Sequence, residues 1–190
     1  MMVSDCGHLL SEITGSARIP APDATLLHAT ATDIIGMVTA YQRDGTNFLS
    51  SGDWVNALAA FWYGFGWLHF GAVFGYLEIP SGACPLGTPP EPAPARCSGQ
   101  LQEKSVRYAR LLDTARAAIV PASEQGTVMH GAAETVLFIT AVYAGQGTRY
   151  QLEGNAETAL ACFSYGHGWL DAAVRAGLFR ITAERDLFTV

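Results

Sequence analysis

The sequence predicts an all-α protein made of two tandem three-helix bundles. Three observations support this prediction. The second half of the chain repeats the first half at a shift of 102 positions, apolar residues recur at helical spacing in both halves, and no segment alternates apolar and polar residues long enough for a sheet. We expect the two halves to share one architecture and to pack together as an intramolecular pseudo-dimer.

The repeat is clearest in one stretch, which reads FWYGFGWLHFGAVFGY at residues 61–76 and FSYGHGWLDAAVRAGL at residues 163–178. The alignment needs no gap from residue 28 to residue 79. It places glycines on glycines and Trp67 on Trp169. We therefore predict a tandem duplication, with a first repeat at 1–79, a linker at 80–99 and a second repeat at 100–190.

The linker holds six of the nine prolines, and proline disrupts helix interiors, so we expect an extended segment there. Cys84 and Cys97 flank its proline-rich part. Either they form a disulfide that closes a loop of about a dozen residues, or they remain reduced thiols in a cytoplasmic protein. The N-terminus has no cationic region followed by an apolar run, which favours a cytoplasmic location without a signal peptide.

Each repeat is expected to contain three helices. The predicted ranges are 5–17, 23–50 and a third helix ending near Leu77, then 101–119, 123–153 and a third helix ending near Phe179. Asp23 and Ser123 are the expected N-caps of the second helices. Gly52-Asp53 and Gly154-Asn155 each supply a break followed by a cap.

The second helices carry an apolar seam. It falls at residues 27, 31, 34, 38, 41, 45 and 48, and again at 129, 133, 136, 140, 143, 147 and 150. Alternating steps of three and four residues are typical of helices packed nearly parallel in a bundle.

The third helices differ in polarity. Residues 54–77 contain no charge and are long enough to span a membrane. The equivalent stretch of the second repeat carries Glu157, Asp171 and Arg175, which are unfavourable in lipid. Because equivalent helices should share one environment, we interpret 54–77 as a helix buried in a protein core and expect no membrane association. Glycines within both helices indicate close contact with another helix or, alternatively, with a ligand.

A polar row follows the second of these helices. His167, Asp171 and Arg175 are spaced i, i+4 and i+8, so they lie on one helical face. The first repeat has Phe65, His69 and Val73 at the equivalent positions.

Two interpretations of the polar row remain open. In one, the row forms a small-ligand or metal site with residues near it, whose candidates are Tyr165, His167, Trp169, Asp171, Arg175 and His130. Its metal-ligand candidates are His130, His167 and Asp171, because imidazole and carboxylate groups bind metals in bundle cores. In the other, the row is a structural seam in which Asp171 pairs with Arg175 and His167 bonds a carbonyl group or a tyrosine.

The composition and the absence of certain motifs argue against several classes of function. The net charge is −6 and the eleven basic residues are scattered, which argues against nucleic acid. The sequence contains no nucleophile motif, no HExxH and no Glu-x-x-His pair, and Cys162 replaces Ala60 on an apolar helix, which indicates a buried, unreactive thiol. We therefore expect a non-catalytic interaction or scaffold protein without a cofactor, which binds a protein partner or associates with itself.

The string LEGNAETALACFSYGHGWLDAAVRAGLF resembles the signature of an archaeal helical family, domain of unknown function 357. The family pattern falls on Tyr165, His167, Trp169, Leu170, Asp171, Ala172, Arg175 and Gly177. The first repeat matches only partially, because it lacks the histidine, aspartate and arginine of that pattern. The resemblance implies small three-helix bundles of the spectrin-like type and brings no established activity.

Overall fold

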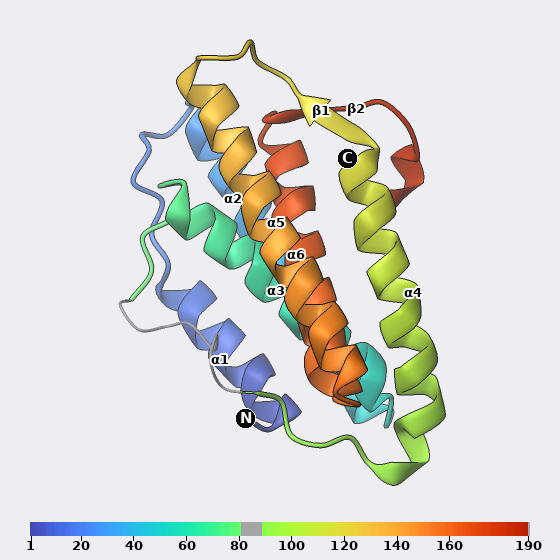
Figure 1. Ribbon diagram of the computed structural model, residues 1–190. Coiled ribbons are helices and arrows are strands. Elements are labelled where there is room, and N and C mark those ends of the chain that lie inside the picture. The colour runs from blue at the N-terminus through green and yellow to red at the C-terminus, as the bar shows by residue number, and fades with distance from the viewer. Residues whose placement is uncertain (81–88, 190) are drawn as a thin grey trace.

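The computed structural model of the chain describes residues 1–80 and 89–189, and within them it is mostly helical (Figure 1). The elements in order are α1 (Val3–Ser16), α2 (Leu26–Ser50), α3 (Trp54–Val73), η1 (Ala95–Cys97), α4 (Ser98–Ala117), β1 (Ile119–Pro121), α5 (Val128–Leu152), α6 (Ala156–Arg175), β2 (Phe179–Ile181) and η2 (Arg185–Leu187). The predicted all-α class is confirmed. The two alternatives for Cys84 and Cys97, a disulfide or reduced thiols, fall partly outside the described residues, because Cys84 is not among them.

Helices α1, α2 and α3 of the first repeat correspond to α4, α5 and α6 of the second. In both repeats, the segment after the first helix forms backbone pairs with the segment after the third helix. Val120 of β1 pairs antiparallel with Arg180 of β2, and Arg18 pairs in the same way with Glu78. The short ladder was not expected from the sequence, because three-residue strands are too short to show alternation. Equivalent contacts at equivalent positions support the two-repeat arrangement.

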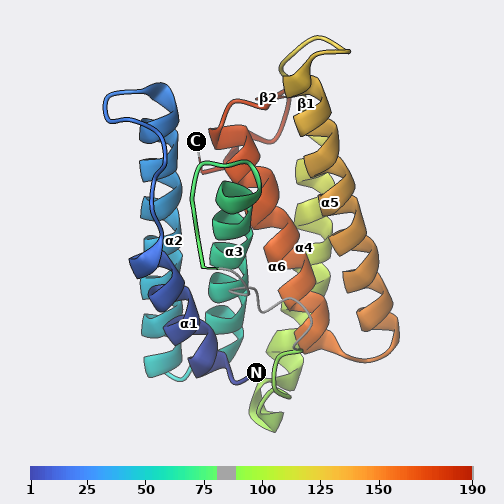
Figure 2. The same ribbon diagram turned by 90° about the vertical axis from the view of Figure 1, so that its left-hand side faces the viewer.

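The two third helices form the centre of the molecule. In Figure 2, α3 and α6 lie side by side, with α1 and α2 on one side and α4 and α5 on the other. Every residue of α3 from Trp54 to Gly71 except Asn56 is buried, and α6 is buried from Ala156 to Val174 except at Glu157. The charge-free segment is therefore an interior helix, as predicted.

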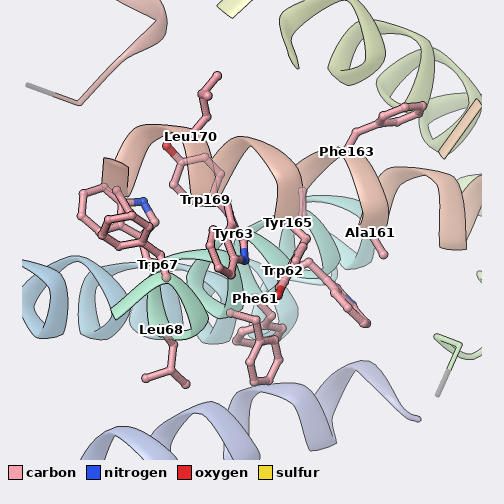
Figure 3. Packing of buried hydrophobic residues seen from close by; sticks show 14 of the residues in the cluster. Phe61, Trp62, Tyr63, Trp67, Leu68, Ala161, Phe163, Tyr165, Trp169 and Leu170 are labelled. Carbon is pink, nitrogen blue, oxygen red and sulfur yellow. The ribbon is translucent and has the colours of Figure 1, made fainter. Parts of the chain in front are cut away.

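Two glycines let α3 and α6 approach closely. A Cβ atom at Gly66 would collide with the carbonyl oxygen of Tyr165, and one at Gly168 would collide with that of Tyr63. Glycine destabilises a helix by about 1 kcal/mol relative to alanine. Here it permits contact between the backbones of the two repeats. Aromatic side chains from both helices fill the space around this crossing (Figure 3).

The predicted N-caps Asp23 and Ser123 are wrong by two and four residues. The caps are Thr25 and Thr127, whose hydroxyls accept from the amides of His28 (3.2 Å) and His130 (3.1 Å). In each case an extended residue three positions before the histidine presents a side-chain oxygen to the first turn. The predicted caps Asp53 and Asn155 are confirmed: they accept from the third residue after them at 3.0 Å.

The predicted seam is correct at its centre and wrong at its ends. The buried residues of α2 are Ala31, Ile34, Val38 and Gly45, and those of α5 are Ala133, Val136, Thr140 and Gly147. Positions 27, 48 and 129, which lie near the helix ends, are exposed. The third helices end at Val73 and Arg175, before the predicted 77 and 179. Gly75 and Gly177 there adopt φ of +72° and +80° and break the helices.

Candidate functional site

The polar row begins with His167 and Asp171, which lie inside the protein. Asp171 is completely buried. Its carboxylate accepts hydrogen bonds from the Thr189 amide (3.1 Å), from the Thr189 hydroxyl (2.5 Å) and from the hydroxyl of Tyr63. These three donors replace the hydrogen bonds to water that a carboxylate loses on burial. Asp171 therefore attaches the segment that follows β2, which we call the C-terminal segment, to α6. It also joins α6 to α3.

His167 binds the same segment one turn earlier. Its Nε2 lies 3.2 Å from the carbonyl oxygen of Leu187, and because a carbonyl only accepts, Nε2 is the donor. Burial lowers the pKa of His167, although the nearby Asp171 charge raises it. The expected bond from His167 to a carbonyl group is present, and the imidazole acts here as a neutral donor.

A second tyrosine contact mirrors the first. The hydroxyl of Tyr165 lies 2.9 Å from Nδ1 of His69. Tyr63 and Tyr165 are equivalent in the two repeats, and so are Asp171 and His69. The first repeat has therefore kept a polar partner for the other repeat's tyrosine, with imidazole in place of carboxylate. The alignment of His69 with Asp171 is the sequence signal for this pair, but it does not show that His69 contacts a tyrosine of the other repeat.

Arg175 does not pair with Asp171, contrary to the interpretation of the row as a seam. It donates from Nε (3.0 Å) and Nη2 (2.8 Å) to the Asp33 carboxylate on α2. Asp171 points into the core, whereas Arg175 is at the exposed end of α6, where it reaches the other repeat. An exposed ion pair of this kind contributes only about 0–1 kcal/mol.

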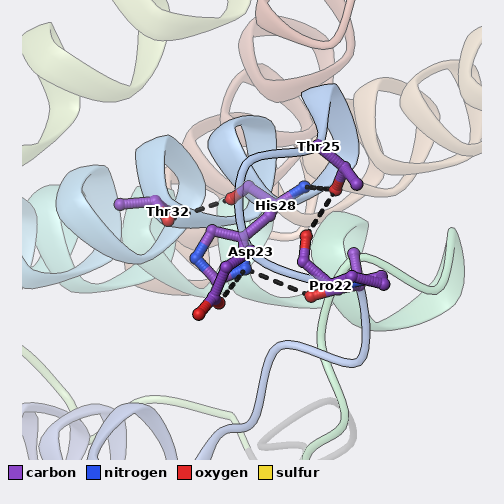
Figure 4. A network of polar contacts seen from close by, with 6 residues as sticks. Pro22, Asp23, Thr25, His28 and Thr32 are labelled. Carbon is purple, nitrogen blue, oxygen red and sulfur yellow. Dashed lines mark hydrogen bonds and ion pairs between the residues drawn. The ribbon is translucent and has the colours of Figure 1, made fainter.

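His130 has a role that both repeats share. Its Nδ1 lies 3.0 Å from the carbonyl oxygen of Ser123, and Nδ1 of His28 lies 3.1 Å from that of Ala21. Each histidine thus closes the loop that leads into its helix, as Figure 4 shows for His28. The structure does not gather His130 with His167 and Asp171, and within 1–80 and 89–189 no three such side chains are placed to hold a metal ion.

Tyr165 and Trp169, the remaining candidates, are core residues. Both are 2 % exposed. The indole of Trp169 packs edge-on against Phe70, with 5.8 Å between ring centroids and an interplanar angle of 87°. Edge-to-face packing at this distance is favourable. These two side chains support the α3–α6 interface (Figure 3).

A cavity of about 310 Å³ lies beside the polar row. Its polar and aromatic lining consists of Tyr41, Asp44, Phe48, Asn56, Tyr63, Tyr108, His167, Asp186, Phe188 and Thr189. Burial raises the pKa of Tyr63, and so does the negative charge of Asp171. Burial also raises the pKa of Tyr41 to about 12. The tyrosines are thus neutral hydroxyls, and Asp44 and Asp186 supply the negative charge of this cavity.

A second cavity, of about 450 Å³, occupies the equivalent place in the second repeat. There Tyr143, Gln146 and Tyr150 stand where the first cavity has Tyr41, Asp44 and Phe48. Its other lining residues include Trp62, Thr158 and Cys162. Burial raises the pKa of the Cys162 thiol to about 12, so this cysteine is protonated at neutral pH and a poor nucleophile. Sequence reasoning found neither cavity, because each forms between elements distant in the chain.

One family model, described as a protein of unknown function (DUF357), matches the chain twice, over residues 8–77 and 107–179. The two segments together cover more than half of the chain and are consistent with a tandem duplication. The resemblance noted for the second repeat is thereby confirmed, and it extends to the first. No curated protein and no solved structure gives a significant match.

Proposed function

Because this chain belongs to the DUF357 family, whose description assigns no activity, we propose a function from the structure: a non-catalytic interaction module that presents the outer face of α5 to a protein partner. The observation that carries the proposal is the exposure of large apolar side chains on this face. Phe138 is 69 % exposed and Leu152 is 86 % exposed. Exposed apolar groups that line up on one surface are typical of interaction sites.

The first repeat provides an internal comparison. The α2 residues equivalent to Phe138, Val142 and Leu152 are Gly36, Ala40 and Ser50, which are small or polar. If the face served only the fold, both repeats would have the same use for it. The difference between α2 and α5 therefore supports a role for α5 outside the fold.

The polar row supports the non-catalytic part of the proposal. His167 and Asp171 make their hydrogen bonds to Leu187 and Thr189, so they hold the C-terminal segment. Among the described residues, α5 is also the one helix whose length and apolar composition would suit a membrane span. The exposed Glu134 and Arg149 on its outer face are unfavourable in lipid, which favours a protein partner.

Thiol labelling tests the proposal. Phe138→Cys and the matched control Gly36→Cys are made in a Cys84→Ser background, in which the other cysteines, 6, 97 and 162, are buried. Each variant is labelled with a maleimide, first as purified protein diluted until its labelling rate no longer depends on protein concentration, and then in a native extract of the source cells. We expect the extract to slow labelling at position 138 at least several-fold and to leave position 36 unchanged. Equal rates in both conditions at both positions would overturn the proposal.

A second candidate function is suggested by the cavity beside the polar row. Aromatic rings combined with carboxylates bind organic cations, since the ring faces and the negative charge both attract them. Tyr41, Phe48 and Tyr108 supply the rings, and Asp44 and Asp186 supply the charge. The equivalent cavity of the second repeat has Gln146 in place of Asp44, which makes it less suited to a cation.

Calorimetric titration with tetramethylammonium tests this candidate. Binding should be measurable with the wild-type protein and at least tenfold weaker with Asp44→Asn. Asp33→Asn, which removes an acid from the same helix outside the cavity, should bind like wild type. Absence of heat with the wild-type protein, or equal losses in both variants, would exclude the cavity as a cation site.

A further inference from the structure

One stripe of residues runs the length of α5 on its solvent side. We call it the α5 stripe, and its members are Gly131, Glu134, Thr135, Phe138, Ala141, Val142, Gly145, Thr148, Arg149 and Leu152. They recur at intervals of three and four, so they lie on one face of the helix. All are exposed except Ala141, which is half-buried. No described element of the chain covers this stripe.

Two glycines in the stripe are not required by packing within the described chain. A Cβ atom added at Gly131 or Gly145 would meet no neighbouring atom within 4 Å. Glycine disfavours a helix relative to alanine, and neither residue adopts a positive φ that would require it. By contrast, Gly147 lies against Phe163 and is needed for packing. Exposed glycines within a helix are useful where a bulky group approaches from outside the chain.

The stripe itself carries the bulky groups that these glycines would accommodate. When two copies of α5 are placed antiparallel about a twofold axis between residues 141 and 142, Phe138 of each copy faces Gly145 of the other. The same arrangement places Leu152 against Gly131. Two large exposed side chains thus each meet a glycine, and the symmetry repeats both contacts.

The charges follow the same register. Glu134 faces Arg149 of the second copy, and Thr135 faces Thr148. His130, which lies 3.7 Å from Glu134, faces Glu153, whose carboxylate lies 2.8 Å from Arg149. Each end of the contact therefore combines the His130–Glu134 pair of one copy with the Arg149–Glu153 pair of the other. A parallel arrangement would instead place Phe138 on Phe138 and Glu134 on Glu134.

We infer that the partner of the α5 face is a second copy of this chain, bound antiparallel through the α5 stripe with Phe138 against Gly145 and Glu134 against Arg149. This inference rests on the proposed interaction function and names its partner. The matched positions of α2 lack the pattern: Gly36 would face Arg43, and Asp33, which would face Thr46, is held by Arg175. The dimer is thus formed by the second repeat alone.

The solution mass of the full chain is the first test. Sedimentation equilibrium should give twice the chain mass of 20.2 kDa at micromolar concentrations. Phe138→Glu should weaken dimerisation at least tenfold, and the matched control Gly36→Glu should leave it unchanged. Because residue 138 is exposed, both variants should keep their helical circular dichroism. A wild-type chain that stays monomeric over this range would overturn the inference.

Charge exchange tests the register. Glu134→Arg alone should weaken the dimer, because it places two arginines against each other. Glu134→Arg combined with Arg149→Glu should restore it to within a few-fold of wild type. Failure of the double variant to recover, while it remains folded, would overturn the antiparallel pairing.

Cross-linking tests the direction. In the Cys84→Ser background, Phe138→Cys and Gly145→Cys chains should each stay uncross-linked under mild oxidation, since like positions lie ~10 Å apart along the helices. A mixture of the two should form a disulfide-linked dimer. Cross-linking of either variant alone, without the mixture doing better, indicates a parallel contact and overturns the inference.

Two further outcomes separate this inference from the proposed function. If position 138 is protected in a native extract while the purified protein is monomeric, the interaction function stands and the partner is a different protein. If the purified monomer co-sediments with phosphatidylglycerol-containing vesicles and Phe138→Glu abolishes this, the α5 face binds lipid. The second result would overturn both the dimer and a protein partner.

Discussion

The hydroxyl of Tyr63 on α3 donates a hydrogen bond to the buried carboxylate of Asp171 on α6. The equivalent tyrosine of the second repeat, Tyr165, contacts His69 of the first. The two repeats are thus linked by a pair of polar contacts, which lie where α3 and α6 approach each other at Gly66 and Gly168. The contacts have the same positions and different chemistry, and only the carboxylate version also holds the C-terminal segment.

Asp171→Asn should lower the free energy of unfolding by about 1–3 kcal/mol, because the amide group of asparagine cannot accept from all three donors and leaves buried groups unsatisfied. Urea unfolding measures this loss. The Thr189 amide, which donates to Asp171, should also exchange its hydrogen faster in the variant. Arg175→Gln is the matched control on the same helix, and its loss should stay under about 1 kcal/mol because its ion pair is exposed. Equal losses in the two variants would contradict the anchoring role of Asp171.

Gly66→Ala should destabilise the protein by about 1–3 kcal/mol or more, since the new methyl group would collide with the backbone of α6 and not with a movable side chain. Gly36→Ala, in the middle of α2, should have the opposite effect. A Cβ there meets no atom within 4 Å, so the better helix propensity of alanine should add about 0.5–1 kcal/mol. Thermal and urea unfolding of both variants check the two signs. A neutral Gly66→Ala would show that α3 and α6 do not approach as closely as described.

Acid should destabilise the protein through His167. Burial lowers the pKa of this imidazole below its ordinary value of 6.5, so the unfolded chain takes up a proton that the folded chain does not. The contribution of His167 to the free energy of unfolding is therefore complete above pH 6.5 and is lost as the pH falls through the folded-state pKa. Urea unfolding on both sides of pH 6.5 should show this decline, and His167→Gln should show a shallower one. An identical pH dependence in the variant would remove His167 as the cause.

The cysteines Cys6 and Cys162 should resist modification in the folded protein. Burial raises the pKa of each thiol to about 12, so the reactive thiolate is scarce at neutral pH. In a Cys84→Ser background, a chromogenic disulfide reagent should react at least a hundredfold more slowly with these thiols before urea is added than after it. Rapid reaction of the folded protein at Cys162, located by mass spectrometry of the labelled protein, would indicate that this thiol is an accessible nucleophile.

The sequence predicted the candidate residues better than their partners. The spacing predicts that His167 and Asp171 form a polar row, but two of their partners, Leu187 and Thr189, belong to a segment with no helical or motif signal. Asp171 and Arg175 have an ideal spacing for an ion pair, but spacing along one helix does not show which neighbouring helix each side chain meets. Arg175 instead pairs with Asp33, a residue of the other repeat. The α5 stripe illustrates the same limit. Its residues can be read from the sequence, but their exposure to solvent cannot.

By itself, the sequence determined the repeat, the helices, the glycine breaks and the buried centre of the seams in α2 and α5. These features depend on local periodicity and on the conformational limits of single residues, which the order of the amino acids expresses directly. Only the tertiary structure decided that α3 and α6 cross at Gly66 and Gly168, that the C-terminal segment covers Asp171, and that Phe138 faces solvent. Those outcomes depend on which surfaces meet, and surfaces from distant parts of the chain meet through packing that no short stretch of sequence specifies.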